Sequence, residues 1–113
     1  MDTTGEDIEW EQPWRAIQFA AEIPHVQNQL ERELSAQHPL YGTEARVIGR
    51  RIDNDDVVAV LRDGTYVNVH LVWATGSSPG AFPGKYPSWF TYGHQDQFIH
   101  AMQADAAEYR GEA

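Results

Sequence analysis

The sequence predicts a single α+β domain, and three observations lead to this prediction. The chain has 113 residues, which is close to the usual size of one domain with one hydrophobic core. Three short runs rich in β-branched residues follow one another in the middle of the chain, and helical periodicity flanks them on both sides. Grouped strands with flanking helices are typical of α+β domains in which helices cover one face of a sheet. We expect residues 10–113 to form this domain.

Residues 1–9 are expected to form an acidic, disordered arm. The first eleven residues contain five acidic and no basic side chains, and the small polar residues at their start bury little surface. The arm either remains a solvated tail or contacts a basic partner. Trp10 and Trp14 are large and apolar, so we expect the chain to pack against the domain from about Trp10 onward.

Two N-terminal helices are expected before the strands. Pro13 fits the first turn of a helix, where its missing N–H has no partner. Helical spacing then continues to about Pro24 through Trp14, Ile17 and Ala21. The second helix has an amphipathic pattern with an apolar face formed by Val26, Leu30 and Leu34. It ends before Pro39, because proline disfavours helical geometry in the preceding residue.

Three strands, at residues 45–52, 57–62 and 65–74, are expected to form an antiparallel meander. The last two are separated by Asp63-Gly64, a strong signal for a two-residue hairpin turn because glycine accepts a positive φ. In the third strand, alternate residues share one face of the sheet. The face expected toward the core carries Val67, Val69, Leu71 and Trp73, and the outer face carries Tyr66, Asn68, His70 and Val72.

A long loop is expected at residues 76–93, because glycine and proline are too frequent there for a regular element. The loop contains five aromatic residues, which are Phe82, Tyr86, Trp89, Phe90 and Tyr92. Surface loops rarely carry so much apolar area. The loop therefore either folds back to complete the core or presents an aromatic contact surface to a partner. After it, apolar residues at helical spacing predict a C-terminal helix over residues 94–109.

The composition argues against several classes of function. A formal net charge of −9 opposes contact with phosphate backbones, so nucleic acid is a disfavoured partner. No apolar run reaches the length of about 18 residues that a membrane span needs, and we expect no membrane partner and a cytoplasmic location. The absence of cysteine excludes disulfides, thiolate metal sites and cysteine catalysis. The five histidines lack metal-ligand spacing, so we expect no metal site and no cofactor.

The chemical motifs of common enzyme families are missing from the sequence. No serine lies in a Gly-x-Ser-x-Gly elbow, and the Gly-rich segment lacks the ending of a phosphate-binding loop. The outer face of the third strand is a weaker candidate, because histidine titrates near neutral pH and can act as an acid or a base. The candidate ligand-binding residues are Arg50, Arg62, Tyr66, Asn68 and His70. The alternative is a polar face that is simply solvated.

Several short motifs are similar to a family of small uncharacterised bacterial proteins. They are the Leu-Tyr-Gly turn at residues 40–42, an arginine-rich first strand, Asp-Asp-Val at residues 55–57 and Val-His-Leu-x-Trp at residues 69–73. The resemblance runs from about Leu30 to Phe98. It implies a bacterial cytosolic α+β domain and no known catalytic residues. The sequence departs from the family pattern at Val72 and in its longer Gly/Pro loop.

The leading functional expectation is a non-enzymatic protein-binding module that uses the aromatic loop and an acidic surface. Small acidic immunity and antitoxin proteins, which neutralise a basic partner through charge complementarity, provide an analogy. Two alternatives remain open. One is a small enzyme or ligand-binding domain that uses His70 and a strand arginine, and the other is a homodimer or larger homo-oligomer formed through the aromatic loop.

Overall fold

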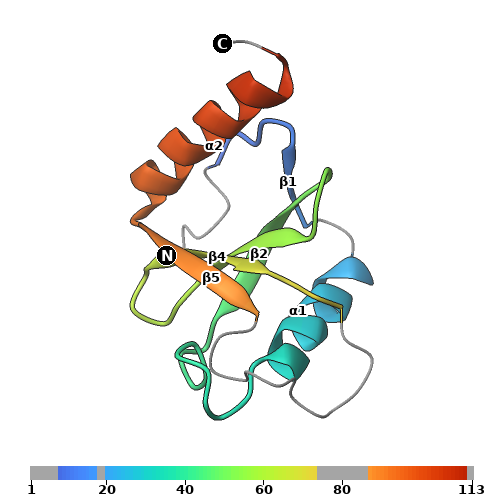
Figure 1. Ribbon diagram of the computed structural model, residues 1–113, viewed down its shortest axis with the longest axis vertical. Coiled ribbons are helices and arrows are strands. Elements are labelled where there is room, and N and C mark those ends of the chain that lie inside the picture. Colours follow the sequence, from blue (N-terminus) through green and yellow to red (C-terminus); the bar gives the residue numbers. More distant parts are fainter. Residues whose placement is uncertain (1–7, 18–19, 74–86, 112–113) are drawn as a thin grey trace.

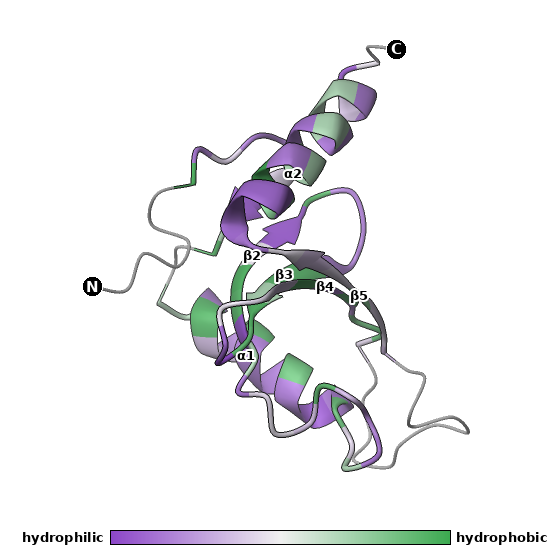
Figure 2. Ribbon diagram, turned by 90° about the vertical axis from the view of Figure 1, so that its left-hand side faces the viewer, coloured by the Kyte–Doolittle hydropathy of each residue, from purple (hydrophilic) through white to green (hydrophobic). Residues whose placement is uncertain are grey.

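The protein folds as a five-stranded antiparallel sheet with one helix on each face (Figures 1 and 2). The computed structural model describes residues 8–17, 20–73 and 87–111. The strands lie in the sheet in their sequence order and are β1 (Trp14–Ala16), β2 (Arg46–Arg51), β3 (Asp56–Val60), β4 (Tyr66–His70) and β5 (Ser88–Gly93). The helices are α1 (Glu22–Glu33) and α2 (Gln95–Tyr109). No helix among these residues is long and apolar enough to cross a bilayer.

The prediction of two N-terminal helices is wrong, because the first of them is replaced by strand β1. The backbone of β1 pairs with β2, with Trp14 opposite Arg51 and Ala16 opposite Gly49. Three residues are too few to show a strand period, and the tertiary pairing overrides the helical spacing. Pro24 does not end a helix either. It lies in the first turn of α1, where backbone N–H groups have no partner within the helix.

The prediction of a three-stranded meander is also wrong, because β1 and β5 extend the sheet to five strands. β5 lies within the segment that was expected to be a loop, and it pairs with β4 through Val69 opposite Trp89 and Asn68 opposite Phe90. Its aromatic and β-branched residues favour a strand, whereas glycine and proline are concentrated earlier in the segment. Residues 76–86 of the predicted loop, and residue 74 at the end of the predicted third strand, lie outside the described residues.

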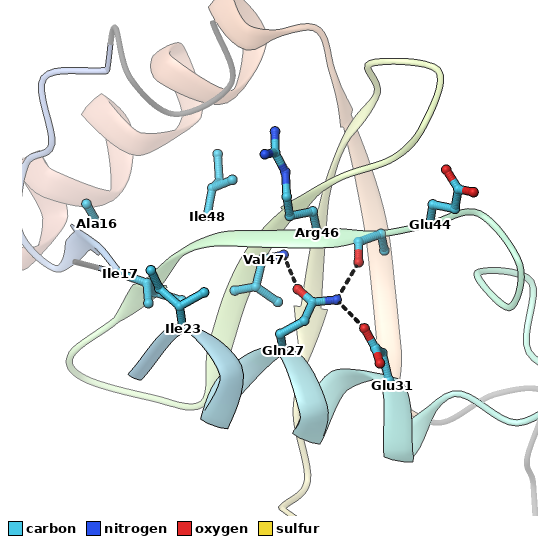
Figure 3. A pocket seen from close by; sticks show the side chains of 10 residues that line it. Ala16, Ile17, Ile23, Gln27, Glu31, Glu44, Arg46, Val47 and Ile48 are labelled. Carbon is cyan, nitrogen blue, oxygen red and sulfur yellow. Dashed lines mark hydrogen bonds between the residues drawn. The ribbon is translucent and has the colours of Figure 1, made fainter. Parts of the chain in front are cut away.

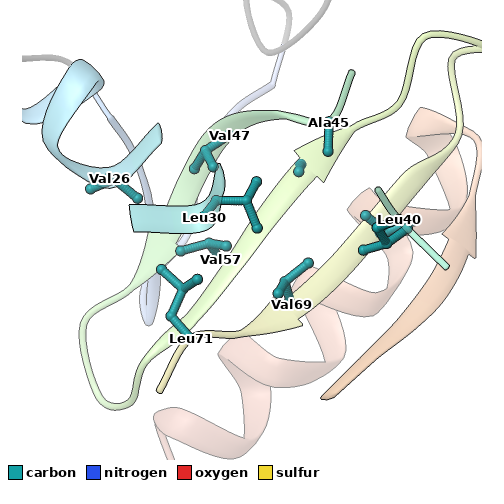
Figure 4. Close-up of a cluster of buried hydrophobic side chains, with 10 residues drawn as sticks. Val26, Leu30, Leu40, Ala45, Val47, Val57, Val69 and Leu71 are labelled. Carbon is teal, nitrogen blue, oxygen red and sulfur yellow. The ribbon is translucent and has the colours of Figure 1, made fainter. Parts of the chain in front are cut away.

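The sequence predicted that helices cover one face of the sheet, but Figure 2 shows a helix on each face. Each covered face has its own core. The first core cluster lies between α1 and the sheet (Figure 4) and consists of Val26, Leu30, Leu40, Ala45, Val47, Val57, Ala59, Val67, Val69 and Leu71. The second core cluster lies between α2 and the sheet and consists of Ile8, Trp14, Val58, Val60, Tyr66, Phe98 and Met102. The core-facing side of β4 was predicted, but its supposed outer face is also buried where α2 covers it.

The N-terminal segment reaches the second core cluster before β1 begins. Ile8, the first described residue, is buried in that cluster. The ring of Trp10 lies 5.9 Å from the ring of Phe98 and packs closely over Gly49 of β2. Glycine is needed there, because a Cβ at this position would lie 2.3 Å from the Trp10 ring. Residues 1–7 of the predicted acidic arm lie outside the described residues.

Candidate functional site

The end of the sheet that α2 leaves uncovered carries a cluster of polar and aromatic side chains. We call this cluster the open sheet face and define it as Asp56, Asn68, His70, Phe90 and Tyr92. Asp56 of β3 lies directly opposite His70 of β4, and Asn68 lies opposite Phe90 of β5. The side chain of His70 is 47% exposed and Phe90 is 53% exposed. The face is therefore accessible, although Asn68 beneath it is buried.

Hydrogen bonds fix the polar side chains of the open sheet face. The Nδ1 atom of His70 lies 2.6 Å from Oδ1 of Asp56. The amide of Asn68 donates to the other Asp56 oxygen at 3.2 Å and to the hydroxyl of Tyr92 at 3.1 Å. An ionised carboxylate only accepts hydrogen bonds, so Nδ1 of His70 carries the proton in this pair. The remaining ring nitrogen, Nε2, is then available as a base or as a hydrogen-bond acceptor.

Tyr92 and Phe90 form the aromatic part of the open sheet face. Their ring centroids are 5.0 Å apart at an interplanar angle of 70°, and Tyr92 also packs edge-on against Phe98 of α2. Burial raises the pKa of the Tyr92 hydroxyl to about 12. This hydroxyl therefore stays neutral at physiological pH. Phe90 is the more exposed ring of the pair.

Arg51 lies on the α2 side of the sheet, and its guanidinium contacts two carboxylates and an aromatic ring. It forms two hydrogen bonds of 2.9 Å with Asp53 and lies 3.5 Å from Asp105 of α2. It also lies 5.7 Å from the centre of the Trp14 ring, and the Trp14 indole donates to Asp105. The hydrogen bond to Arg51 holds the pKa of Asp53 below its usual value, and the same bond raises the pKa of Arg51. This network fastens α2 to β1 and β2.

The five predicted ligand-binding residues do not form one site. Arg50 lies on the α1 side of the sheet, 3.6 Å from Glu22 and over the ring of Trp73. Arg62 lies at the β3–β4 hairpin with its side chain 68% exposed. Tyr66 is buried in the second core cluster, where its hydroxyl accepts a hydrogen bond from Gln95. The structure brings together only Asn68 and His70.

The five predicted partner-binding aromatics are also divided. Phe90 and Tyr92 lie on the open sheet face. Trp89 points to the opposite face of β5, where it packs against the first core cluster with its ring 6.3 Å from that of His38. His38 is buried and bonds the carbonyl of Pro87, which anchors the start of β5. Phe82 and Tyr86 lie outside the described residues.

Sequence reasoning missed Asp56 as a partner of His70, because the hairpin register differs from the predicted one. A two-residue turn at Asp63-Gly64 would place Val57 opposite His70. The observed turn is one residue longer, since Leu61 bonds Thr65 across it and Gly64 takes a φ of 90°. The pairing then moves by one residue and places Asp56 opposite His70. The sequence could have predicted the pairing of Asp56 with His70, but only if the length of the hairpin turn had been known.

Within the described residues, no three His, Asp or Glu side chains are grouped so that they could hold a metal ion. The open sheet face is thus a candidate for binding or for proton transfer through its own side chains. No family model, curated protein or solved structure matches this chain. The resemblance to small bacterial proteins stays a prediction.

Proposed function

We propose that this protein is a protein-binding module whose contact surface is the open sheet face. The observation that carries the proposal is the position of Phe90, a large apolar side chain that is 53% exposed in the middle of an ordered strand. Its neighbours Tyr92 and His70 are held by hydrogen bonds or ring packing. Rigid aromatic residues of this kind are enriched at the energetic centres of protein interfaces.

The chemistry of the surrounding surface favours a basic partner. The turn between β2 and β3 places the exposed residue Asp55 next to Asp56, and the whole chain has a net charge of −9. Acidic groups around an aromatic centre increase the association rate of a positively charged partner and make it dependent on salt. By analogy, small acidic immunity and antitoxin proteins bind basic partners in this way.

Photo-crosslinking from position 90 tests the proposal. A photoreactive phenylalanine analogue at position 90 is expected to give a single crosslinked protein. The same analogue at Tyr41, which is an exposed aromatic residue outside the open sheet face, is the matched control and is expected to give none. Crosslinking of equal strength from both positions would contradict the proposal. A product made only of two copies of this chain, with a dimer mass in light scattering, would replace the heterologous partner with a homodimer.

A second candidate function is acyl transfer, and the register of three strands favours it. Asp56, His70 and Ser88 lie opposite one another on β3, β4 and β5. In this reaction the Ser88 hydroxyl would attack an ester carbonyl while Nε2 of His70 takes the hydroxyl proton and passes it to the leaving alcohol, and water would then hydrolyse the acyl-serine. This candidate is the weaker one, because neither Arg50 nor Arg62 lies near His70.

Hydrolysis of 4-nitrophenyl acetate distinguishes the two candidates. An enzyme requires turnover above that of free imidazole, and this turnover should be lost in both Ser88→Ala and His70→Gln. A rate that persists in Ser88→Ala would show only general reactivity of an exposed histidine and would remove the acyl-transfer candidate.

A further inference from the structure

The edge of β2 that faces α1 is only partly covered by a strand. β1 pairs with β2 from Gly49 to Arg51, and the N–H of Ile17 adds a hydrogen bond to the carbonyl of Ile48. Among the described residues, no strand lies beside residues 45–47 on this side of β2. The outward N–H and C=O groups of this stretch are therefore positioned for a further strand.

A side-chain amide from α1 occupies that position. Nε2 of Gln27 donates to the carbonyl oxygen of Ala45 at 2.9 Å, and Oε1 of Gln27 accepts from the N–H of Val47 at 2.8 Å (Figure 3). An adjacent strand would bond these same two backbone groups. The amide of Gln27 is thus a stand-in for the backbone of a neighbouring strand.

A groove of about 750 Å³ lies directly beside this amide, between α1 and β2. Its apolar lining residues include Ile17, Ile23 and Ile48. Figure 3 shows Ile17 and Ile23 on the α1 side of β2 and Ile48 on the other side of that strand, and Ile23 is 48% exposed. The Gln27 amide satisfies the strand edge without any need for a groove beside it. The volume of this groove is in the range of sites that hold ligands. The groove combines an apolar wall with a strand edge.

We propose that this groove binds an extended segment of a partner protein, which pairs with residues 45–47 and displaces the amide of Gln27. Strand addition of this type takes its affinity from backbone hydrogen bonds and its specificity from alternate side chains. The segment would place an apolar side chain against Ile23 and a basic side chain near Glu31. The Glu31 carboxylate accepts a 2.8 Å hydrogen bond from Gln27 and becomes available when that amide leaves.

The charge on β2 argues against a second copy of this chain as the occupant. Two β2 edges paired antiparallel about residue 46 would place two Arg46 side chains directly opposite each other. Like charges at directly opposed positions destabilise a strand pair. The groove also lies between α1 and β2, whereas the open sheet face lies on the α2 side of β3, β4 and β5, so the two sites can be tested separately.

Nuclear magnetic resonance titration of the full chain tests the proposal, with a short end-capped peptide of alternating valine and lysine as the probe. We expect the peptide to shift the backbone amide of Val47 and the side-chain amide of Gln27. Gln27→Ala removes the competing amide and should tighten binding about tenfold, since two hydrogen bonds no longer have to be broken. Glu31→Gln should weaken binding, and Asn28→Ala, at an exposed α1 position outside the groove, is the matched control.

Three results would overturn the proposal. A peptide with N-methylated central residues that binds as well as the parent would show that strand pairing is not involved. Chemical shift changes confined to the open sheet face would show that the peptide binds there and not in the groove. That result would leave the proposed function unaffected. A Gln27→Ala variant that dimerises without peptide would identify a second copy as the occupant. If that variant does not fold, the comparison of both peptides on the unaltered chain decides.

Discussion

At the scale of single residues, the Tyr92 hydroxyl links the second core cluster to the open sheet face. An unfolded tyrosine titrates near pH 10, and burial raises the pKa of Tyr92 to about 12. Its contribution to stability is therefore fully present below pH 10 and is lost as the pH rises toward 12.

We expect Tyr92→Phe to lower the free energy of unfolding at neutral pH by about 1 kcal/mol, because the hydrogen bond from Asn68 is lost. We also expect the free energy of unfolding of the variant to fall less than that of the unaltered chain as the pH becomes alkaline. Urea unfolding at neutral and alkaline pH measures both effects. Tyr41→Phe, at an exposed tyrosine, is the control and should change neither, and an unchanged alkaline decrease in Tyr92→Phe would contradict the assignment.

Glu22 joins α1 to the sheet through the charge of its carboxylate. Its carboxylate accepts a 2.8 Å hydrogen bond from Arg15 and lies 3.6 Å from Arg50. The hydrogen bond from Arg15, together with the charges of Arg15 and Arg50, lowers the pKa of Glu22 below its usual value of 4.5. A lowered pKa gives stability that is present above the unfolded value and is lost as the pH falls through the folded value.

We expect Glu22→Gln to reduce the free energy of unfolding at neutral pH by about 0.5–1 kcal/mol, since the ion pair is partly solvated. The difference from the unaltered chain should shrink as the pH falls below 4.5. Denaturant unfolding on both sides of that pH measures the change. An equal loss of stability at acid and neutral pH would mean that Glu22 acts through packing and not through charge.

For the polar residues of the open sheet face, the sequence predicted which side chains share a face but not which side chains bond each other. Alternation along a strand was enough to place Asn68 and His70 on one face. The hydrogen-bond partner of His70 was not predictable in the same way, because a one-residue change in the hairpin turn exchanges Val57 for Asp56. The burial of Tyr66 was missed for a different reason, since only the packing of Phe98 over it makes that end of the face apolar.

At the scale of elements, the contact between the N-terminal segment and β2 depends on the absence of a side chain at Gly49. A Cβ there would lie 2.3 Å from Trp10 and 3.0 Å from the carbonyl oxygen of Arg15. We expect Gly49→Ala to lower the free energy of unfolding by about 1–3 kcal/mol through overpacking. Thermal unfolding measures the loss.

A double variant provides the control for this contact. In Trp10→Leu the large ring is gone, so adding Gly49→Ala should cost less than it does in the unaltered chain. Costs that are equal in the two backgrounds would show that the strain comes from β1 and not from Trp10.

The elements that were predicted incorrectly are those whose structure depends on a distant partner. The three central strands and the C-terminal helix have strong local patterns, and each begins within one residue of its expected start. The third strand was expected to reach residue 74 but ends at His70. β1 has three residues, which are too few to show a strand period, and the Gly/Pro-rich segment before β5 obscured the strand propensity of its aromatic residues. Their strand geometry results from pairing with β2 and β4.

At the scale of the whole molecule, one sheet separates two cores. Leu30 fills the first core cluster and Phe98 fills the second, and both are fully buried. Every residue of β3 after Asp56 is buried in one cluster or the other. Because the two cores share these strands, they should unfold together.

We expect Leu30→Ala and Phe98→Ala each to lower the free energy of unfolding by about 2–5 kcal/mol while preserving a single transition. Circular dichroism reports the helices and tryptophan fluorescence reports both cores, so coincident curves would support one cooperative unit. Two separated transitions in either variant would contradict this expectation.

We assign partner binding to the open sheet face and structural roles to the aromatic residues packed in the cores. Phe90→Ala removes the exposed ring of that face, whereas Tyr41→Ala removes an exposed ring elsewhere. The most direct test is the affinity of both variants for the protein crosslinked from position 90, measured by calorimetry at low and high salt. We expect Phe90→Ala to weaken binding at least about thirtyfold, which corresponds to the roughly 2 kcal/mol of an interface hot spot, with unchanged thermal stability. We expect Tyr41→Ala to bind normally and salt to weaken binding of the unaltered chain. Unchanged affinity in a folded Phe90→Ala variant would contradict the assignment of partner binding to the open sheet face.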